Sequence, residues 1–313
     1  MEQNSYNTLM FKHISVATKE AVSYIKARKE HLIDPLKSRW PKFNYVSGGG
    51  IEPGCVYTIA GASGTGKSSF VNTLETDLID LNPTKEVVVL SFSLEMLSSR
   101  QVGRKISNKL RKTTLDLYSS NDEISNETLM QVEESAKEIA NYPIYYVDEA
   151  ADVQSIADTI AYFQETIAKD KWLIVILDHI LLVEGDGESE RAIISKLQRV
   201  FIKAKKVGTT SIIQLSQMNR NIETPDRINN PASHYPMRSD LSSSDSIFQG
   251  SDIVTVLSRP EILGITAYGP QRLPVQNKIY LHFLKQREGE LAIIEYENNL
   301  KYNDLIEVNR SEA

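Results

Sequence analysis

Cysteine is nearly absent from this chain of 313 residues, which contains only Cys55. A disulfide framework or a multi-cysteine metal site is therefore excluded. No apolar run approaches the ~20 residues that a membrane-spanning helix requires, and residues 1–30 lack the apolar segment of a secretory signal. These absences predict a cytoplasmic protein that does not contact a membrane.

An excess of positive charge is also missing, because 35 Lys and Arg residues are outnumbered by 41 Asp and Glu residues, for a net charge of −6. This balance argues against a protein that coats nucleic acid over its whole surface, although a local basic groove is compatible with it. The hydrophobic fraction of 41% is ordinary for a globular chain that buries a full core. The length allows one large domain or two small ones.

The first 35 residues carry apolar side chains at roughly helical intervals among Lys, Glu and Arg. This spacing predicts an amphipathic helix within residues 8–33. Packing on its own domain and packing on a neighbouring subunit both fit the pattern. Three consecutive glycines at 48–50 then predict a flexible joint. The expected parts of the chain are an arm over residues 1–47, a core domain over 48–300 and a C-terminal tail over 301–313.

From residue 51, short β-rich runs alternate with helical stretches. Near-continuous apolar strands between amphipathic helices indicate an α/β fold with a mostly parallel sheet and helices on both faces. Two late runs on either side of residues 287–290 predict an antiparallel hairpin that completes the sheet. The expected strands are Val56–Ala60, Val87–Ser93, Ile144–Val147, Trp172–Asp178, Thr210–Leu215, Ile253–Leu257, Lys278–Leu284 and Leu291–Tyr296. The expected helices include Lys67–Leu81, Met96–Arg111, Glu127–Ala140, Val153–Ala168 and Arg191–Lys206.

The segment GASGTGKS at residues 61–68 fits the pattern G-x-x-x-x-G-K-[ST], follows a predicted strand and opens a predicted helix. Glycines let the backbone wrap a phosphate, so that successive N–H groups and the helix N-terminus point at it. Lys67 is expected to reach the β- and γ-phosphates of a nucleoside triphosphate, and Ser68 to bind Mg²⁺. The predicted nucleotide contacts are Ser63, Gly64, Thr65, Gly66, Lys67, Ser68 and Ser69.

Two carboxylates are candidates for the rest of this site. Asp178 ends the apolar run from Trp172, which is the Walker B pattern, so we expect it to hold Mg²⁺ rather than to cap a helix. Hydrolysis also needs a base that orients water. Glu95 follows the strand Val87–Ser93, which we expect beside the phosphate-binding strand, but taken alone it is better explained as a first-turn acid of the next helix. His179 is expected to be a strand-end residue and not a base.

Two connections follow predicted strands and exceed a simple turn. Residues 184–190 are acidic and Gly-rich, and residues 218–246 are a long polar stretch with several prolines. Long loops are either functional or disordered, and α/β folds bind ligands at the carboxyl ends of their strands. We therefore expect a binding role for these loops, with disordered filler as the alternative.

Further segments occur in a characteristic order: SFSLEM at 91–96, LD at 177–178, LSQMNR at 215–220, SDL with SI within 239–247, and KQREG at 285–289. Together with the P-loop, they resemble the motor domain of the DnaB-like replicative helicases, a branch of the RecA-like ATPases. The resemblance covers about residues 38–298, and the FSLEM and KQR-x-G matches are specific to that branch. It implies a RecA-like P-loop NTPase core behind a linker helix. It also implies a homohexameric ring that uses ATP and Mg²⁺ to move along single-stranded DNA and unwind duplex during replication.

The resemblance also implies roles for individual residues. Glu95 matches the catalytic glutamate, and Gln217 matches a sensor that couples the γ-phosphate to the DNA-binding loop. Lys285 and Arg287 match a lysine and an arginine finger that enter the neighbouring subunit's nucleotide site, where positive charge stabilises the transferring phosphoryl group. Without the family, these two would be read as hairpin charges with no function. Residues 8–33 match the linker helix that packs on the adjacent subunit.

The chain departs from the family pattern before the motor. Family members carry a helical N-terminal domain that contacts primase, whereas only some 50 residues precede the motor in this sequence. We therefore expect a short, phage-type form that dispenses with that domain or obtains it from another chain. Primase and a helicase loader remain candidate partners.

The loop that grips DNA is the second departure. The family's usual DLRESGSI is DLSSSDSI at residues 240–247, so Ser242 replaces an arginine and Asp245 replaces a glycine. Loss of a guanidinium and gain of a carboxylate should both weaken phosphate binding. Arg220, Arg227 and Arg238 are the candidate substitute cations. The predicted DNA contacts are Arg220, Arg238, Ser242, Ser243 and Ser244.

Two other functions fit the same residues. One is a RecA-like ATPase of the RadA or KaiC type in recombination or regulation, an alternative that Ser242 keeps open. The other is a nucleotide-dependent ring scaffold that unwinds nothing, although a pure binder needs neither Glu95 nor Arg287. The leading prediction is an ATP-dependent replicative DNA helicase.

Overall fold

The computed structural model describes residues 10–120, 123–242 and 244–309, and it contains two compact units, Met1–Pro35 and Leu36–Ala313. The first unit contains α1 (Ile14–Lys29), a helix with no buried residue. The apolar side chains that predicted this helix lie on its surface, since Ile14 is 73% and Ile25 is 65% exposed. The amphipathic pattern thus predicted the helix correctly.

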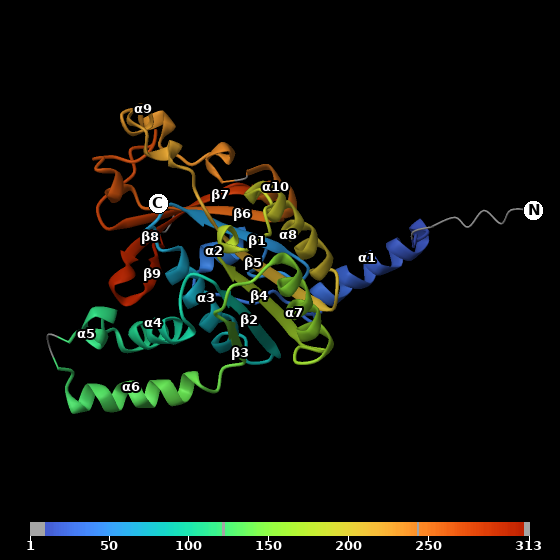
Figure 1. The fold of residues 1–313 in the computed structure, drawn as a ribbon. Coiled ribbons are helices and arrows are strands. Elements are labelled where there is room, and N and C mark those ends of the chain that lie inside the picture. Colours follow the sequence, from blue (N-terminus) through green and yellow to red (C-terminus); the bar gives the residue numbers. More distant parts are fainter. Residues whose placement is uncertain (1–9, 121–122, 243, 310–313) are drawn as a thin grey trace, which may run out of the picture. The chain divides into compact units, whose positions relative to one another are not determined.

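The second unit is built on one large sheet, whose strands follow the apolar runs of the sequence closely (Figure 1). The strands are β1 (Val56–Gly61), β2 (Val87–Ser93), β3 (Ile144–Val147), β4 (Trp172–Asp178), β5 (Thr209–Gln217), β6 (Ile253–Ser258), β7 (Lys278–Gln286), β8 (Ile293–Asn299) and β9 (Asp304–Glu307). The α-helices are α2 (Pro41–Val46), α3 (Lys67–Asp80), α4 (Ser98–Leu110), α5 (Thr114–Tyr118), α6 (Asn126–Ile139), α7 (Val153–Glu165), α8 (Glu190–Ala204), α9 (Pro225–Ile228) and α10 (Ser244–Gly250). Short 3₁₀-helices are η1 (Ile180–Leu182), η2 (Arg220–Glu223), η3 (Pro231–Ser233), η4 (Arg238–Asp240), η5 (Pro260–Leu263) and η6 (Leu300–Tyr302).

The strand order is β3-β2-β4-β5-β1-β6-β7-β8-β9. The first six strands in this order, β1 to β6 in chain numbering, are parallel to one another. Strands β7, β8 and β9 then extend the sheet with antiparallel pairing. The predicted mostly parallel α/β sheet and its closing hairpin are therefore confirmed. The expected neighbour relation between β2 and the phosphate-binding strand β1 is wrong, because β4 and β5 lie between them. The order of strands in a sheet depends on how the connecting helices pack across it. Apolar runs along the sequence do not encode this order.

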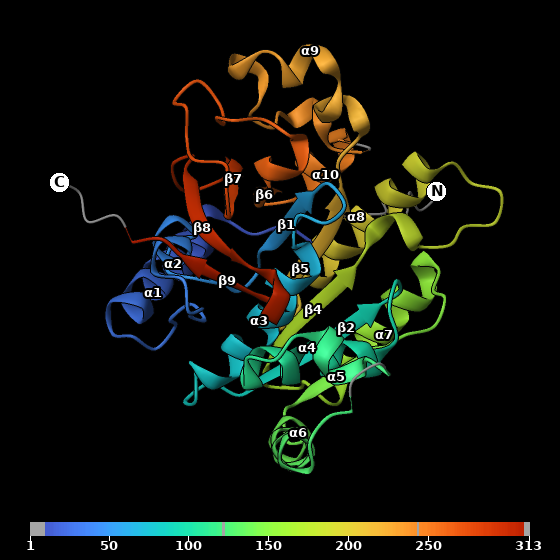
Figure 2. The ribbon, with the colours of Figure 1, turned by 90° about the vertical axis from the view of Figure 1, so that its left-hand side faces the viewer.

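Alternate residues of each parallel strand face two separate cores. In β4, Ile174 and Ile176 pack in the core shared with α3, whereas Val175 and Leu177 pack in the core shared with α7 and α8. Figure 2 shows α2 and α3 on one side of the sheet and α7 and α8 on the other. Burial on both faces explains why β4 is apolar along its whole length up to Asp178.

Residues 36–47, which the sequence groups with the arm, pack in the larger unit. Trp40 is buried and its ring stacks on Phe70 of α3 with 4.1 Å between ring centroids. Its Nε1–H donates a hydrogen bond of 2.8 Å to the carbonyl of Leu305 in β9. The predicted C-terminal tail therefore includes a strand that is tied to this aromatic core.

The predicted joint at the three glycines is a hydrogen-bonded turn. Leu36 and Ile51 exchange both backbone hydrogen bonds, at 2.9 and 2.8 Å. Gly50 has φ +135°, and a Cβ there would lie 2.1 Å from the carbonyl oxygen of Leu36. Only glycine satisfies this close approach, so this position is a packing requirement of the core.

The long connection after β5 contains η2, α9, η3 and η4 before α10. Arg227 holds these turns together, because it pairs with Asp240 at 2.6 Å and donates to the carbonyls of Ser233 and Tyr235. Across the described residues of both units, no helix combines the length and the apolar character needed to cross a membrane.

Candidate active site

The phosphate-binding segment joins β1 to α3 and has the conformation that its glycines predict. Gly64 and Gly66 have φ of +76° and +96°, and Gly66 is the N-cap of α3. A Cβ at Gly66 would lie 2.7 Å from a methyl group of Leu300. The segment therefore wraps tightly and aims the N-terminus of α3, with its positive dipole end, at the carboxyl edge of the sheet.

Lys67 is buried at the first position of α3. Its Nζ donates hydrogen bonds of 2.9 and 3.0 Å to the carbonyls of Gly61 and Ala62. Burial lowers the pKa of Lys67, and the carboxylates of Asp178 and Glu95 act in the opposite direction. The ammonium group is thus poised beside two carboxylates at the mouth of the P-loop.

Three other predicted nucleotide contacts lie differently within the loop. Ser63 is exposed, whereas Thr65 is buried and its hydroxyl donates to the carbonyl of Ala62 at 2.9 Å. The hydroxyl of Ser69 is directed to Asn303 Oδ1, 3.5 Å away.

Asp178 ends β4 and is 6% exposed. Its carboxylate is hydrogen-bonded to the Ser68 side chain, and its Oδ1 is buried without a partner among the described residues. Burial raises the pKa of Asp178 to about 6, with a smaller contribution from the charge of Glu95. A buried carboxylate oxygen with no donor, paired with a serine hydroxyl, is a donor set that suits Mg²⁺. The predicted Ser68 and Asp178 ligands therefore fit that ion.

Glu95 lies two residues beyond β2, in the turn that leads to α4. Although β2 is not beside β1, it is paired with β4, so Ser93 stands opposite Asp178 in the register. The Leu94 N–H donates a 2.9 Å hydrogen bond to the Asp178 carbonyl. The Glu95 carboxylate is 53% exposed and lies 3.9 Å from Nε2 of His179. Strand pairing through β4 thus brings Glu95 to the site by a different route from the expected one.

His179 is a strand-end residue, as expected. Its side chain accepts the N–H of Leu181 and caps η1. Burial lowers its pKa, whereas the Glu95 carboxylate acts in the opposite direction. The ring nitrogen that accepts the Leu181 N–H serves as the cap of η1, which supports a structural role for His179 and not that of a base.

Gln217 is the last residue of β5 and is paired in register with Gly61, the first residue of the P-loop. Its carbonyl accepts the N–H of Ser242 at 3.2 Å, and Met218 forms an isolated bridge with Leu241. Gln217 is therefore paired with the first residue of the P-loop on one side and is hydrogen-bonded to the loop over residues 240–242 on the other.

Lys285 and Arg287 lie at the end of the sheet opposite the P-loop, where the parallel strand β6 begins. Because β7 runs antiparallel to β6, its end is beside the start of β6, where Gln286 is paired with Ile253. Arg287 pairs with Asp252, and Lys285 Nζ donates to the carbonyls of Phe248 and Ser251. The two predicted fingers are therefore far from the P-loop of their own chain.

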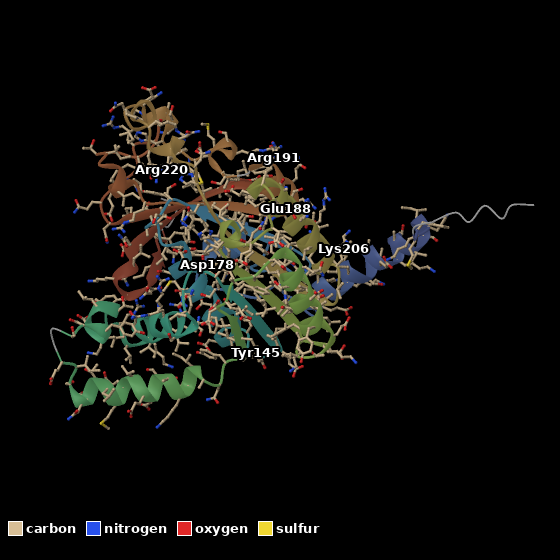
Figure 3. The ribbon with its side chains drawn as sticks, viewed as in Figure 1. Tyr145, Asp178, Glu188, Arg191, Lys206 and Arg220 are labelled. Atoms are coloured by element: carbon tan, nitrogen blue, oxygen red, sulfur yellow. The ribbon has the colours of Figure 1, made fainter. Side chains whose placement is uncertain are left out.

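The predicted DNA contacts gather in the segment between β5 and α10. Arg220 is exposed, and Figure 3 shows it on the outer segment that includes α9, away from Asp178 at the end of β4. Arg238 pairs with Asp245 at 2.6 Å, and its guanidinium lies 4.7 Å from the centroid of the Phe248 ring. Arg227 is engaged in contacts with Asp240, Ser233 and Tyr235, which argue against its proposed role as a substitute DNA cation. Ser242 is half-buried, Ser243 lies outside the described residues, and Ser244 begins α10.

Sequence reasoning missed Arg104, which α4 brings to the same site. The carboxylates of Asp178 and Glu95 raise its pKa in part, but burial lowers it overall. Its Nη1 is buried and has no partner among the described residues. The only available signal was its position on the helix that follows Glu95, which does not by itself predict a contact.

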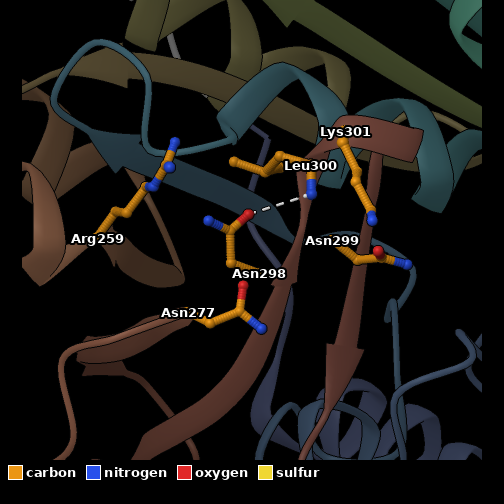
Figure 4. A pocket seen from close by; sticks show the side chains of 6 residues that line it. All are labelled: Arg259, Asn277, Asn298, Asn299, Leu300 and Lys301. Carbon is orange, nitrogen blue, oxygen red and sulfur yellow. Dashed lines mark hydrogen bonds between the residues drawn. The ribbon is translucent and has the colours of Figure 1, made fainter. Parts of the chain in front are cut away.

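A second missed feature is a pocket of about 540 Å³ next to the P-loop. Figure 4 shows its lining, in which the Leu300 N–H is hydrogen-bonded to Asn298 Oδ1 at 3.2 Å. The pocket adjoins the P-loop because Leu300 contacts Gly66 and Arg259 donates to the Gly64 carbonyl at 3.4 Å. The lining residues are Arg259, Asn277, Asn298, Asn299, Leu300 and Lys301.

Comparisons with known proteins agree with this geometry. The fold is similar to a solved ATPase domain, with a TM-score of 0.79, 20% identity and coverage of 93% of this chain and 98% of that one. It is also similar to the structure of a DnaB-like replicative helicase that was described together with its interactions with primase. Here the TM-score is 0.77 and the identity 20%, and the match covers 97% of this chain and 69% of that one. The predicted RecA-like fold is thereby confirmed.

A curated relative is the replicative DNA helicase DnaB of Mycoplasma genitalium, 28% identical over 263 residues, or 81% of this chain and 53% of the relative. The chain spans about half the length of such relatives. The family model of the DnaB-like helicase C-terminal domain matches residues 36–306, which include every site residue described above. The chain therefore belongs to the DnaB-like helicase C-terminal domain family.

Proposed function

We propose that this chain is the ATP-hydrolysing motor of a replicative DNA helicase, which assembles as a homohexameric ring and moves along single-stranded DNA. The observation that carries the proposal is the position of Arg287. Asp252, its partner, accepts the N–H of Val56 at the start of β1, whereas the P-loop begins at Gly61. At ~3.3 Å per residue these ends of β1 are roughly 17 Å apart. Arg287 is therefore remote from the nucleotide of its own chain, which supports a role at the nucleotide of a neighbouring chain.

Each remaining side chain has a distinct task in hydrolysis. Lys67 and the N-terminus of α3 hold the phosphates, and Glu95 orients the attacking water and accepts its proton. Arg104 stabilises negative charge on the transferred group from within the chain, and Arg287 does so from the neighbour. Ser68 and Asp178 would hold Mg²⁺, which when bound neutralises charge on the phosphates.

The nucleoside of ATP is assigned to the pocket beside the P-loop. Its volume of about 540 Å³ suits a nucleoside-sized group. The amide of Asn277 offers a donor and an acceptor to a base or ribose, and Leu300 offers an apolar contact. The amide of Asn298 is bonded to Glu261 and to the Leu300 N–H and so fixes the shape of the lining.

Gln217 would couple the nucleotide to DNA. Its register with Gly61 and its bond to Ser242 support a path on which movement at the γ-phosphate shifts the loop over residues 240–242. The exposed Arg220 and the Arg238 of the same segment would contact the DNA backbone, together with the Ser242, Ser243 and Ser244 backbone or hydroxyl groups.

The exposed apolar residues of α1, such as Ile14 and Ile25, support the proposal that this helix packs on the adjacent subunit. Primase and a helicase loader are the proposed protein partners. A similar DnaB-like helicase was solved for its interactions with primase.

The test is ATPase activity with and without single-stranded DNA, combined with a mass measurement of the assembly over a range of protein concentrations. We expect DNA to stimulate hydrolysis and the rate per chain to rise as rings form. Lys67→Ala is the inactive control. A ring that assembles with ATP but hydrolyses it slowly, with or without DNA, would instead favour a scaffold.

A further inference from the structure

A buried amide connects the P-loop helix to the helix after Glu95. Asn72 lies five residues after Lys67 on α3, and Gln101 lies on α4. The Nδ2 of Asn72 donates to both Oε1 and the backbone carbonyl of Gln101, each at 3.1 Å. The two residues are 3% and 6% exposed, so water does not replace these bonds.

The other end of the same amide reaches the turn that carries Glu95. The Nε2 of Gln101 donates to Ser93 Oγ at 3.1 Å, and Ser93 Oγ donates to the Met96 carbonyl at 2.7 Å. Ser93 and Met96 flank Glu95 in the sequence, so this pair of bonds closes the turn around it. The chain of contacts therefore runs from the P-loop helix through Gln101 to the backbone of the catalytic turn.

We infer that Gln101 is a positioning residue for Glu95, which sets the location of the carboxylate relative to the phosphate cradle. This inference rests on the proposed function. Glu95 needs such support because its own side chain is half exposed, and the imidazole of His179, at 3.9 Å, is too far to hold the carboxylate by a hydrogen bond. A primary amide suits the task, since it accepts from Asn72 with its oxygen and donates to Ser93 with its nitrogen.

The hydrogen bonds of Gln101 are not the only contacts that join α3 and α4. Lys105 of α4 pairs with Glu75 of α3 at 2.7 Å, and both side chains are buried. Lys105 also donates to the Asn72 carbonyl at 2.9 Å. With these bonds in place, loss of the Gln101 amide leaves α3 and α4 packed and loosens only the turn that carries Glu95.

The experiment compares Gln101→Met, which keeps the length and apolar volume of the side chain, with the wild-type chain. ATP affinity should change less than about 3-fold, whereas kcat should fall at least about 10-fold, because a small displacement of a catalytic group has a large effect on rate. Gln164→Met is the matched control. Its amide joins α7 to the Ala204 carbonyl and to Thr210, close to the start of β5 at the opposite edge of the sheet, so its kcat should equal that of the wild type.

A double-mutant cycle with Ser93→Ala separates positioning from general destabilisation. If one path serves Glu95, the double variant should have a kcat within about 2-fold of the slower single variant, since neighbours on one path are not additive. Should Gln101→Met fail to fold, Ser93→Ala tests the same path, because it removes the acceptor of the Gln101 amide, and an unchanged kcat in Ser93→Ala would overturn the inference.

The outcomes also separate this inference from the proposed function. A wild-type chain that hydrolyses ATP while Gln101→Met has unchanged kcat overturns the inference only, as do rate losses that multiply in the double variant. A wild-type chain that hydrolyses no ATP under any condition overturns the proposed function, and the inference falls with it.

Discussion

The guanidinium of Arg287 forms an ion pair with Asp252 of the same chain, with 2.9 Å between Nη1 and Oδ1. The same carboxylate pairs with Lys205 at 2.5 Å and accepts the N–H of Val56. Asp252 is 6% exposed, whereas the Arg287 side chain is 55% exposed. Arg287 therefore has an exposed end that can exchange this carboxylate for a phosphate on another chain, while Lys205 continues to neutralise Asp252.

Replacing Arg287 with alanine should abolish ATP turnover and change ATP affinity by less than about 3-fold, because the finger acts on the transition state in another subunit. A mixture of Arg287→Ala and Lys67→Ala chains should recover activity. At an interface between the two variants, one chain supplies Lys67 and the other supplies Arg287. Phosphate release and nucleotide titration measure the two quantities.

The control for this experiment is Arg199→Ala, which removes an exposed arginine of α8 and should leave turnover unchanged. Two results would contradict the finger assignment. One is normal hydrolysis by Arg287→Ala, and the other is a mixture that stays inactive.

The DNA-facing segment should respond to changes of single charges. Asp245→Ser removes the carboxylate that pairs with Arg238, so affinity for single-stranded DNA should rise.

Arg220→Ala should lower the affinity for single-stranded DNA and reduce the slope of log K against log salt by about 0.7, the value for one phosphate contact on a single strand. Fluorescence anisotropy at several salt concentrations measures both effects. Equal affinities for Asp245→Ser and the wild type would argue against contact between Arg238 and DNA.

Asp178→Asn should stabilise the chain in the absence of nucleotide and metal while abolishing hydrolysis. Burial raises the pKa of Asp178 to about 6 from 3.8, so above pH 6 the fold holds a charge that the unfolded chain solvates better. The gain in unfolding free energy should reach at most about 3 kcal/mol above pH 6. It should vanish below about pH 3, where both states are protonated. Urea unfolding in EDTA at several pH values tests this, and a gain that is independent of pH would refute the electrostatic explanation.

His282 should make the fold sensitive to acid. It is buried with Nε2 2.8 Å from Tyr268 Oη, and burial lowers its pKa from 6.5 to about 3. Between these values the unfolded chain binds a proton that the folded chain excludes, so stability should fall by about 1.4 kcal/mol per pH unit below 6.5. His282→Gln keeps a polar partner for Tyr268 and cannot titrate. The difference in unfolding free energy between the two chains should therefore change with pH over this range, and a constant difference would disprove the assignment.

The sequence predicted most of the sheet because the parallel strands are short runs rich in apolar and β-branched residues between helical stretches. The bounds of β2, β3 and β4 agree with the prediction to the residue. Strand β9 was not predicted because Asp304–Glu307 has a single buried apolar side chain, Leu305, and pairs only with β8. The short helices between β5 and α10 were not predicted because their polar sequence is equally compatible with an irregular loop. Contacts between residues distant in the segment, such as the ion pair of Arg227 with Asp240, hold them in place.

The family, the phosphate cradle and the identity of the catalytic candidates follow from the sequence by itself, because glycines, Lys67 and the strand-ending Asp178 encode them locally. Tertiary structure alone decided that Glu95 reaches the site through β4, that Arg104 and Gln101 lie beside it, and that Arg287 lies at the edge opposite its own P-loop. These relations depend on strand order and on contacts between residues far apart in the chain, and side-chain patterns along a single segment do not specify either.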